Sequence, residues 1–166
     1  MFQALQVLAV LLVATAMALA LAHALELPGK LRLAKEAYLA IQTIYYPGFT
    51  IGGASEPIGI IALLVLTIVT PTGTAAFWLT LGALTALAAM HAVYWLATHP
   101  VNNFWLKDFR LRGVSARFFG LAPSRRAGGT STLEWTALRD QWEYSHVARA
   151  GLGLLSLALL ATAVAI

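Results

Sequence analysis

The chain has 166 residues, of which 60% are hydrophobic and only 11% are charged. Soluble domains carry roughly 25% charged residues, so much of this protein's surface must face lipid rather than water. No cysteine is present, which excludes disulfides, iron–sulfur clusters, thiolate zinc sites and a cysteine nucleophile. The net charge of +4 indicates basic loops that orient the protein and contact membrane lipid, and we predict no nucleic-acid partner.

Four segments are apolar enough to cross a bilayer, which takes about 20 residues. The predicted spans cover residues 2–25, 52–70, 74–98 and 144–166. The first lacks the basic start of a signal peptide, so we expect a retained helix that ends at Pro28-Gly29. The third is expected to stop at His99-Pro100. The predicted fold class is therefore all-α, a four-transmembrane-helix bundle that forms a single integral membrane domain over residues 1–166.

Two longer connections join these spans. In the first, apolar side chains recur at helical spacing and predict a short interfacial helix within residues 31–44; they are Leu33, Ala37, Ala40, Ile41 and Ile44. In the second, Ser131-Thr132-Leu133-Glu134 fits a helix-capping box. No helix breaker follows, so we expect one long last helix that extends into the cytoplasm and continues as the fourth span. Within that span, Gly151 and Gly153 fit close helix packing.

Basic residues are distributed unevenly along the chain. Ten of the eleven Lys and Arg residues lie in the two longer connections, and the remaining one, Arg149, lies inside the last span. The positive-inside rule then predicts that both termini are outside and that the long connections are cytoplasmic. We expect the membrane to be a bacterial inner membrane.

Titratable side chains gather at the predicted cytoplasmic end of the bundle. They are His23, Glu26, Glu56, His91, His99, Glu143, His146 and Arg149. Ionisable residues within spans are costly and usually face the bundle interior or a wet cavity. This end is therefore where we expect any chemistry to take place.

The last predicted helix carries one polar and aromatic stripe. Trp135, Arg139, Trp142, His146 and Arg149 follow one another at spacings of four, three, four and three residues, so they share a face. The pKa of histidine lies near neutral pH, so a histidine can act as a general base. A fixed arginine can stabilise a developing negative charge. The candidate catalytic residues are His146, Arg149 and His91, and the candidate substrate-binding residues are Trp142, Trp95, Asn102 and Trp135.

A bound metal is a second hypothesis for the same end. Glu143 and His146 have the Glu-x-x-His spacing of di-iron carboxylate bundles, and His23 and Glu26 have it in reverse order. The candidate metal ligands are His23, Glu26, Glu56, His91, Glu143 and His146, for iron, copper, zinc or manganese. The histidines near helix ends also fit interfacial positions, and Glu26 and Glu56 fit ion pairs with Lys30 or Arg149. A site without any cofactor therefore stays open.

The segment His99-Pro100-Val101-Asn102-Asn103, with the stretch from Trp135 to Arg149, resembles the anthrone oxygenase-like family of small four-helix membrane proteins. That family has long been classified as a domain of unknown function. The residues that carry the likeness are Pro100, Asn102, Trp135, Trp142, His146 and Arg149, within residues 90–155. Some fungal members of that family are associated with the oxidation of anthrones to anthraquinones without a metal or organic cofactor. The resemblance therefore implies a related oxidation for this chain. Residues 23–30 depart from the family pattern, which leaves room for another substrate or for a metal.

From these observations we expect an integral membrane oxidoreductase, oxygenase-like, with a pocket on the cytoplasmic side for a small apolar substrate, aromatic or lipid-like. The alternative is a non-catalytic accessory subunit that binds a lipid, quinone or pigment, with other membrane subunits or further copies of itself as partners. A small carrier is disfavoured because the outer halves of the spans offer no polar path.

Overall fold

The computed structural model describes residues 1–105 and 132–166, and every regular element in these two ranges is helical. The elements are α1 (Phe2–Lys30), α2 (Lys35–Ile41), the 3₁₀ segment η1 (Gln42–Tyr45), α3 (Gly48–Gly53), α4 (Ser55–Val69), α5 (Ala75–Val93), the π-helical segment η2 (Tyr94–Thr98), α6 (His99–Trp105) and α8 (Thr132–Ala165). Four helical stretches within these residues are long and apolar enough to span a membrane: Phe2–Lys30, Gly48–Val69, Ala75–Asn102 and Trp135–Ala165. They confirm the expected four spans and indicate an integral membrane protein.

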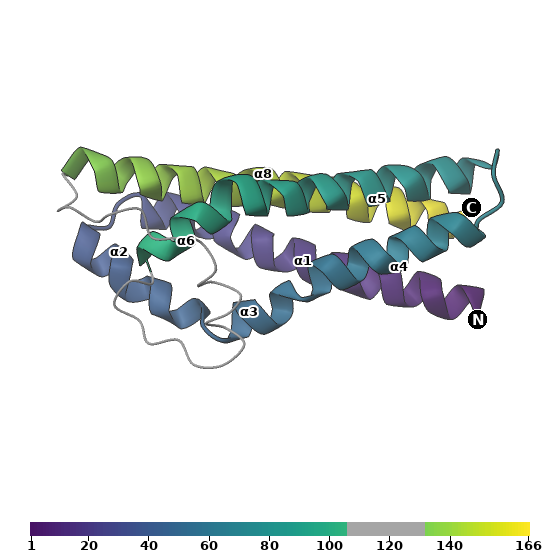
Figure 1. Ribbon diagram of the computed structural model, residues 1–166, viewed down its shortest axis with the longest axis horizontal. Helices are drawn as coiled ribbons and strands as arrows, with labels where there is room; N and C mark the ends of the chain where they lie inside the picture. The colour runs from purple at the N-terminus through teal and green to yellow at the C-terminus, as the bar shows by residue number, and fades with distance from the viewer. Residues whose placement is uncertain (106–131) are drawn as a thin grey trace.

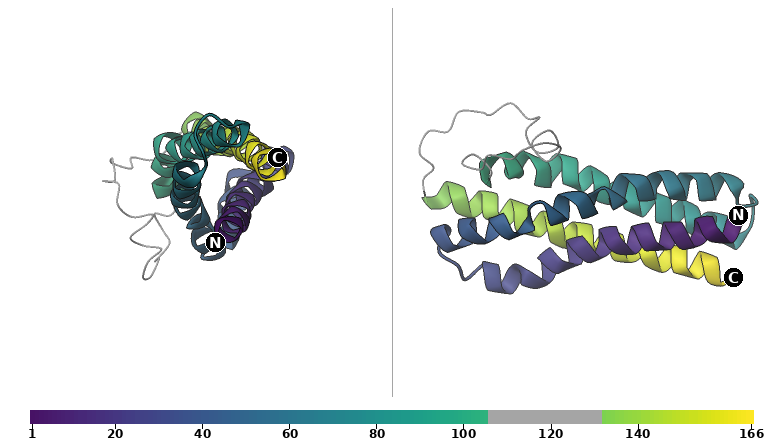
Figure 2. Two further views of the ribbon diagram at one scale, coloured as in Figure 1. Left: turned by 90° about the vertical axis from the view of Figure 1, so that its right-hand side faces the viewer. Right: turned by 90° about the horizontal axis from the view of Figure 1, so that it is seen from below.

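The four long helices form one bundle (Figures 1 and 2). Both α4 and α8 pack along α1 and α5, so the order around the bundle is α1, α4, α5, α8. Both termini and the turn between α4 and α5 lie at one end, and α2, α6 and the start of α8 lie at the other (Figure 1). We call the second end the connection end, and the polar site described below lies towards it.

The bundle is packed for a lipid solvent. Its core is rich in alanine and includes Ala9, Ala16, Ala20, Ala62, Ala83 and Ala150, whose small side chains let the helices approach closely. Large aliphatic side chains point outwards instead: Leu11 and Ile61 are each 61% exposed and Ile68 is 72% exposed. In water this arrangement would leave a large apolar surface uncovered, whereas in a bilayer the lipid covers it.

One close approach between α1 and α8 leads to a stability prediction. A Cβ atom at Gly153 would lie 3.1 Å from the Cα of Met17, whereas a Cβ at Gly151 would meet nothing within 4 Å. Gly153→Ala is therefore expected to destabilise the bundle by about 1–3 kcal/mol through overpacking. The matched control Gly151→Ala should be neutral or slightly stabilising. Thermal unfolding in detergent, followed by circular dichroism, checks both; equal effects would contradict the prediction. Of the two glycines expected at close packing, only Gly153 is at such a contact.

The first helix does not end at Pro28-Gly29 as expected. It continues to Lys30, whose Nζ lies 2.9 Å from Glu26 Oε2, one turn earlier. A proline inside a helix removes one backbone hydrogen bond. The ion pair across this last turn stabilises the helix in spite of that loss, and it brings Lys30 into the bundle interior.

The third span also continues past the proline at which we expected it to stop. Ahead of Pro100 the helix widens into η2, where the His99 N–H donates to the Tyr94 carbonyl five residues earlier. The wider turn gives the proline ring room that an α-helix would not provide. The Ala97 carbonyl accepts a hydrogen bond from Gln141 Nε2 of α8, at 3.0 Å. Helix α6 can therefore follow directly and carry Asn102 towards α8.

A short helix is present in the first connection, as α2 and η1. Of the predicted apolar stripe, Ala37 and Ala40 are exposed and Ile44 is 70% exposed, whereas Leu33 is partly buried against the aromatic residues of the connection end. The buried side chains are Tyr38, Gln42 and Tyr45. The reason is again the solvent, because apolar side chains are stable against lipid while the polar tyrosine hydroxyls need partners inside the protein.

The expectation of one long last helix is confirmed over Thr132–Ala165, which has 34 residues without a break. Ser131 of the predicted capping box lies outside the described residues, as does the side chain of Glu134.

Candidate functional site

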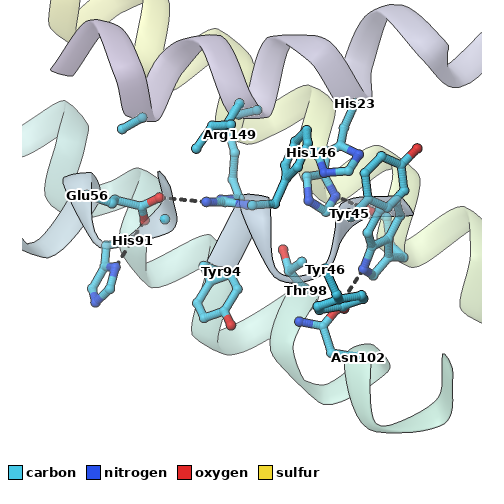
Figure 3. Close-up of a pocket in the computed structure, with 16 residues that line it drawn as sticks. His23, Tyr45, Tyr46, Glu56, His91, Tyr94, Thr98, Asn102, His146 and Arg149 are labelled. Atoms are coloured by element: carbon cyan, nitrogen blue, oxygen red, sulfur yellow. Dashed lines mark hydrogen bonds and ion pairs between the residues drawn. The ribbon is translucent and has the colours of Figure 1, made fainter. Parts of the chain in front are cut away.

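A cavity of about 80 Å³, enough for several water molecules, lies between the helices towards the connection end (Figure 3). Its wall is mainly aromatic and apolar, with a few polar groups that converge on it. The titratable, polar and aromatic lining residues are His23, Tyr45, Tyr46, Phe49, Glu56, His91, Tyr94, Thr98, Asn102, Trp142, His146 and Arg149. A concave, largely apolar space with a few fixed polar groups is typical of small-molecule sites.

The cavity brings together most, but not all, of the predicted site residues. Lining it are His23, Glu56, His91, Asn102, Trp142, His146 and Arg149. Glu26, Glu143, Trp95 and Trp135 do not line it. Trp95 is 43% exposed on the outer side of its helix, and Trp135 packs among the aromatic residues of the connection end, near Tyr38. The prediction that these two tryptophans bind the substrate is therefore not supported by their positions.

Arg149, Glu56 and His91 form a linked set at one side of the cavity (Figure 3). Arg149 donates from NH2 to Glu56 Oε2 at 2.6 Å, and His91 Nδ1 lies 3.0 Å from Glu56 Oε1. Trp95 donates from Nε1 to His91 Nε2 at 2.9 Å. Because Nε2 accepts that bond, the proton of a neutral His91 is on Nδ1 and points to Glu56. In this arrangement both ring nitrogens of His91 have a partner, and the ring bridges Trp95 and Glu56.

Arg149 has a further N–H donor at its Nε atom. This atom is buried and has no hydrogen-bond partner among the described residues. The guanidinium also lies over the Tyr94 ring, 5.2 Å from its centroid. Glu56 thus holds one edge of the guanidinium, and the Nε–H of the same group has no acceptor among the described residues.

His146 is buried on α8, one turn after Trp142. Its Nδ1 lies 2.8 Å from the Trp142 carbonyl oxygen, which can only accept, so a neutral His146 has its proton on Nδ1 and its lone pair on Nε2. Trp142 itself donates from Nε1 to Asn102 Oδ1 at 2.8 Å. Asn102 therefore fixes the tryptophan ring that packs against His146, with centroids 4.1 Å apart. Trp142 and His146 both belong to the stripe that the spacing predicts on the last helix.

A second polar cluster surrounds Lys30, next to the cavity. The Lys30 Nζ lies 2.9 Å from Glu26 Oε2, 3.5 Å from Glu143 Oε1 and 3.3 Å from His23 Nδ1. It also lies over the rings of Tyr45 and Trp142, at 4.8 and 4.9 Å from their centroids. Lys30 is thus a buried ammonium group held by carboxylates and aromatic faces.

The tyrosines of the first connection are the functional residues that the sequence reasoning missed. The Tyr38 hydroxyl donates to Glu143 Oε1 at 2.8 Å, and the Tyr45 hydroxyl donates to Glu26 Oε2 at 2.5 Å. Burial, with the hydrogen bond to Glu26 next, holds the pKa of Tyr45 well above its usual value. The only sequence signal was the adjacent pair Tyr45-Tyr46, and tyrosines at membrane interfaces are too common to single it out.

Tyr46, which lines the cavity, leads to a pH prediction. Burial raises the pKa of Tyr46 from 10.0 to about 12. A raised pKa on an acid favours the neutral form in the folded state, so this contribution to stability is complete below pH 10 and is lost as the pH rises from 10 to 12. The free energy of unfolding should fall by about 2 kcal/mol across that window, at 1.36 kcal/mol per pKa unit with a discount for partial exposure. In Tyr46→Phe this fall in the free energy of unfolding between pH 10 and 12 should be absent. A titration followed by the ultraviolet absorbance of tyrosinate should show one fewer tyrosine that ionises above pH 10.

The six predicted metal ligands do not form one site. The described residues contain no group of three or more His, Asp or Glu side chains that could hold a metal ion. Glu56 pairs with Arg149, and Glu26 and Glu143 both pair with Lys30. The predicted ligand set is therefore divided between two cationic side chains, which take the place that a metal cation would have among these carboxylates.

The fold and the site together define a class, a small four-helix membrane protein with a mainly aromatic and apolar cavity, lined by a few polar groups, towards one end of its bundle. No family model matches the chain, and the comparisons with curated proteins and with solved structures also find no match.

Proposed function

We propose that the protein is an integral membrane oxidoreductase of the oxygenase-like type, acting on a small apolar aromatic substrate that enters from lipid. The observation that supports this most directly is that His146 and Arg149 line the same aromatic cavity. His146 has its lone pair on Nε2, and Arg149 has an unpartnered Nε–H. A base and a fixed cation in a site of low dielectric are what proton abstraction from a C–H group conjugated with a carbonyl requires.

An anthrone-type ketone fits this arrangement and is the substrate class that the family resemblance implies. His146 Nε2 takes a proton from the CH₂ group next to the aromatic rings, and the charge moves to the carbonyl oxygen. The Arg149 Nε–H donates to that oxygen and stabilises the enolate. Dioxygen is the oxidant: one of its atoms becomes the new carbonyl oxygen, and the other leaves as water with the two hydrogens of the CH₂ group. Tyr45, Phe49 and Trp142 provide aromatic faces for the ring system.

The test is anthrone oxidation by the purified protein in nanodiscs, with anthraquinone formation followed by absorbance. His146→Ala is expected to lower the rate by about 100-fold or more, the usual contribution of a general base. The control is Trp78→Phe, at the opposite end of the bundle and 63% exposed, which should leave the rate unchanged. Equal rates for wild type and His146→Ala would remove His146 from the mechanism.

The second candidate function is an accessory subunit that binds a quinone, pigment or lipid without turnover. An aromatic cavity that is also lined by the N–H donors of Arg149 and Asn102 supports the binding of a ring compound, with or without a reaction. Purification in mild detergent separates the two: stoichiometric migration with a large complex favours the accessory subunit, and a free protein or homo-oligomer that binds anthrone favours the enzyme.

We further propose that the connection end is cytoplasmic in a bacterial inner membrane. In this orientation both termini are outside, α2 lies at the interface, and the first turns of α8 extend into the cytoplasm. The support is the placement of ten of eleven basic residues in the two longer connections. The natural chain has no cysteine, so single cysteines can report orientation. Thr72→Cys should react with an impermeant thiol reagent added outside whole cells, and Ser124→Cys should react only after lysis.

A further inference from the structure

Besides His91 and His146, the cavity is lined by His23, whose role is not explained by the base and the cation above. His23 of α1 and His146 of α8 come from opposite ends of the sequence, and their rings touch with centroids 4.3 Å apart (Figure 3). The His23 ring also packs against Tyr45, Phe49 and Trp142. Both imidazoles line the same cavity.

Hydrogen bonds give the two rings opposite character. His146 donates from Nδ1 to the Trp142 carbonyl, so its Nε2 is an acceptor. His23 Nδ1 lies 3.3 Å from the Lys30 ammonium group, which can only donate, so the proton of a neutral His23 is on Nε2. Within the described part of the chain, neither Nε2 atom has a hydrogen-bond partner. The cavity therefore faces one imidazole lone pair and one imidazole N–H.

Lys30 connects His23 to the protein surface. The lysine is itself buried, but its partner Glu26 has a side chain that is 42% exposed. The other groups that face Lys30 are Glu143 of α8 and the rings of Tyr45 and Trp142. A chain of close contacts thus leads from solvent at Glu26, through the Lys30 ammonium, to His23 Nδ1.

We propose that His23 is the proton donor of the cavity and that Lys30 holds it in the donating tautomer and resupplies its proton. This inference rests on the function proposed above and extends it to a paired acid and base for an enolisable aromatic ketone. It also gives a role to residues 23–30, the segment that departs from the family pattern.

The proton balance closes within the cavity. The substrate C–H bond breaks and its proton goes to His146 Nε2, while the electron pair moves into the enolate. The His23 Nε2–H bond breaks, its electron pair stays on the ring, and an O–H bond forms on the substrate oxygen held by Arg149. Lys30 passes a proton to His23 Nδ1 as Nε2 loses its own. The proton on His146 Nε2 then moves to His23 Nε2, and His23 returns its Nδ1 proton to Lys30. The net change is from ketone to enol.

The first test needs no ligand. Protein labelled with ¹⁵N-histidine is placed in nanodiscs at neutral pH, and long-range ¹H–¹⁵N spectra identify the tautomer of each ring, assigned with His23→Asn and His146→Asn. We expect the Nε2–H tautomer for His23 and the Nδ1–H tautomer for His146. Lys30→Met should shift the His23 signals towards mixed tautomers, Lys30→Arg should preserve them, and Lys35→Met is the control.

An Nδ1–H tautomer for His23 in the wild type would overturn the proposal, as would a spectrum that does not respond to Lys30→Met. If Lys30→Met does not fold, the double variant Lys30→Met with Glu143→Gln replaces it, since it removes the ammonium group together with the buried carboxylate that pairs with it, and it should shift the His23 signals in the same way.

The second test measures enolisation separately from oxidation. Under anaerobic conditions in D₂O, exchange of the anthrone CH₂ protons is followed by NMR. His23→Asn should slow the protein-dependent exchange by about 100-fold, within the range for acid–base catalysis. Unchanged exchange in His23→Asn, with oxidation still dependent on His146, would overturn the donor role and leave the proposed function intact. A wild-type protein that does not turn over anthrone at all would remove the proposed function, and the tautomer spectra would still decide the state of His23.

Discussion

Arg149→Met is expected to destabilise the protein by about 3–5 kcal/mol, the cost of leaving one partner of a buried ion pair without the other. The Glu56 side chain is only 4% exposed, and Arg149 NH2 lies 2.6 Å from its Oε2. Without the guanidinium, the carboxylate keeps His91 as its remaining partner. The loss includes the position of α4 against α8, since this pair joins the two helices that do not otherwise pack closely.

The matched double variant separates charge from packing. Arg149→Met combined with Glu56→Gln removes both charges and should recover most of the lost stability, because an uncharged amide is far less costly to bury than an unpaired carboxylate. Arg32→Met, at an exposed position after α1, is the control and should change stability little. The cycle compares four proteins: the wild type, Arg149→Met, Glu56→Gln and the double variant. The free energy of unfolding of each is measured in detergent by circular dichroism. A double variant as unstable as Arg149→Met would mean that the guanidinium acts through packing on Tyr94 and not through Glu56.

Lys30→Met should have the second largest effect, several kcal/mol, and it should depend on which carboxylate is left behind. The Glu143 side chain is fully buried, its Oε1 lies 3.5 Å from Lys30 Nζ, and its Oε2 has no hydrogen-bond partner among the described residues. Glu26 is much more exposed and can regain water when the lysine is removed. The destabilisation therefore comes mainly from Glu143.

Two double variants test this difference. Adding Glu143→Gln to Lys30→Met should restore a large part of the stability, whereas adding Glu26→Gln should restore little. The measurement is the midpoint of thermal unfolding in nanodiscs, with the Glu143→Gln and Glu26→Gln single variants as references. Equal rescue by the two substitutions would show that burial does not decide the cost at this cluster.

How much of the site followed from the sequence depends on the kind of signal. The stripe of Trp135, Trp142, His146 and Arg149 is a local, periodic feature of one helix, and all four side chains are largely buried in the bundle. The metal hypothesis finds no support in the described residues. Glu-x-x-His spacing is also local, yet a metal site needs ligands from several helices to meet at one point. Here Lys30 and Arg149 meet the carboxylates first.

The sequence by itself determined the four spans, the all-α class and the gathering of polar residues towards one end, because these follow from lengths and compositions that lipid enforces on each segment separately. Only the tertiary structure decided which ring nitrogen has the proton in neutral His23, His91 and His146, since that depends on neighbours from other turns and helices: Lys30 for His23, Trp95 for His91, and the Trp142 carbonyl for His146. It also decided that Tyr38 and Tyr45 turn inwards, since their hydroxyls find carboxylates across the bundle while the neighbouring apolar side chains are stable against lipid.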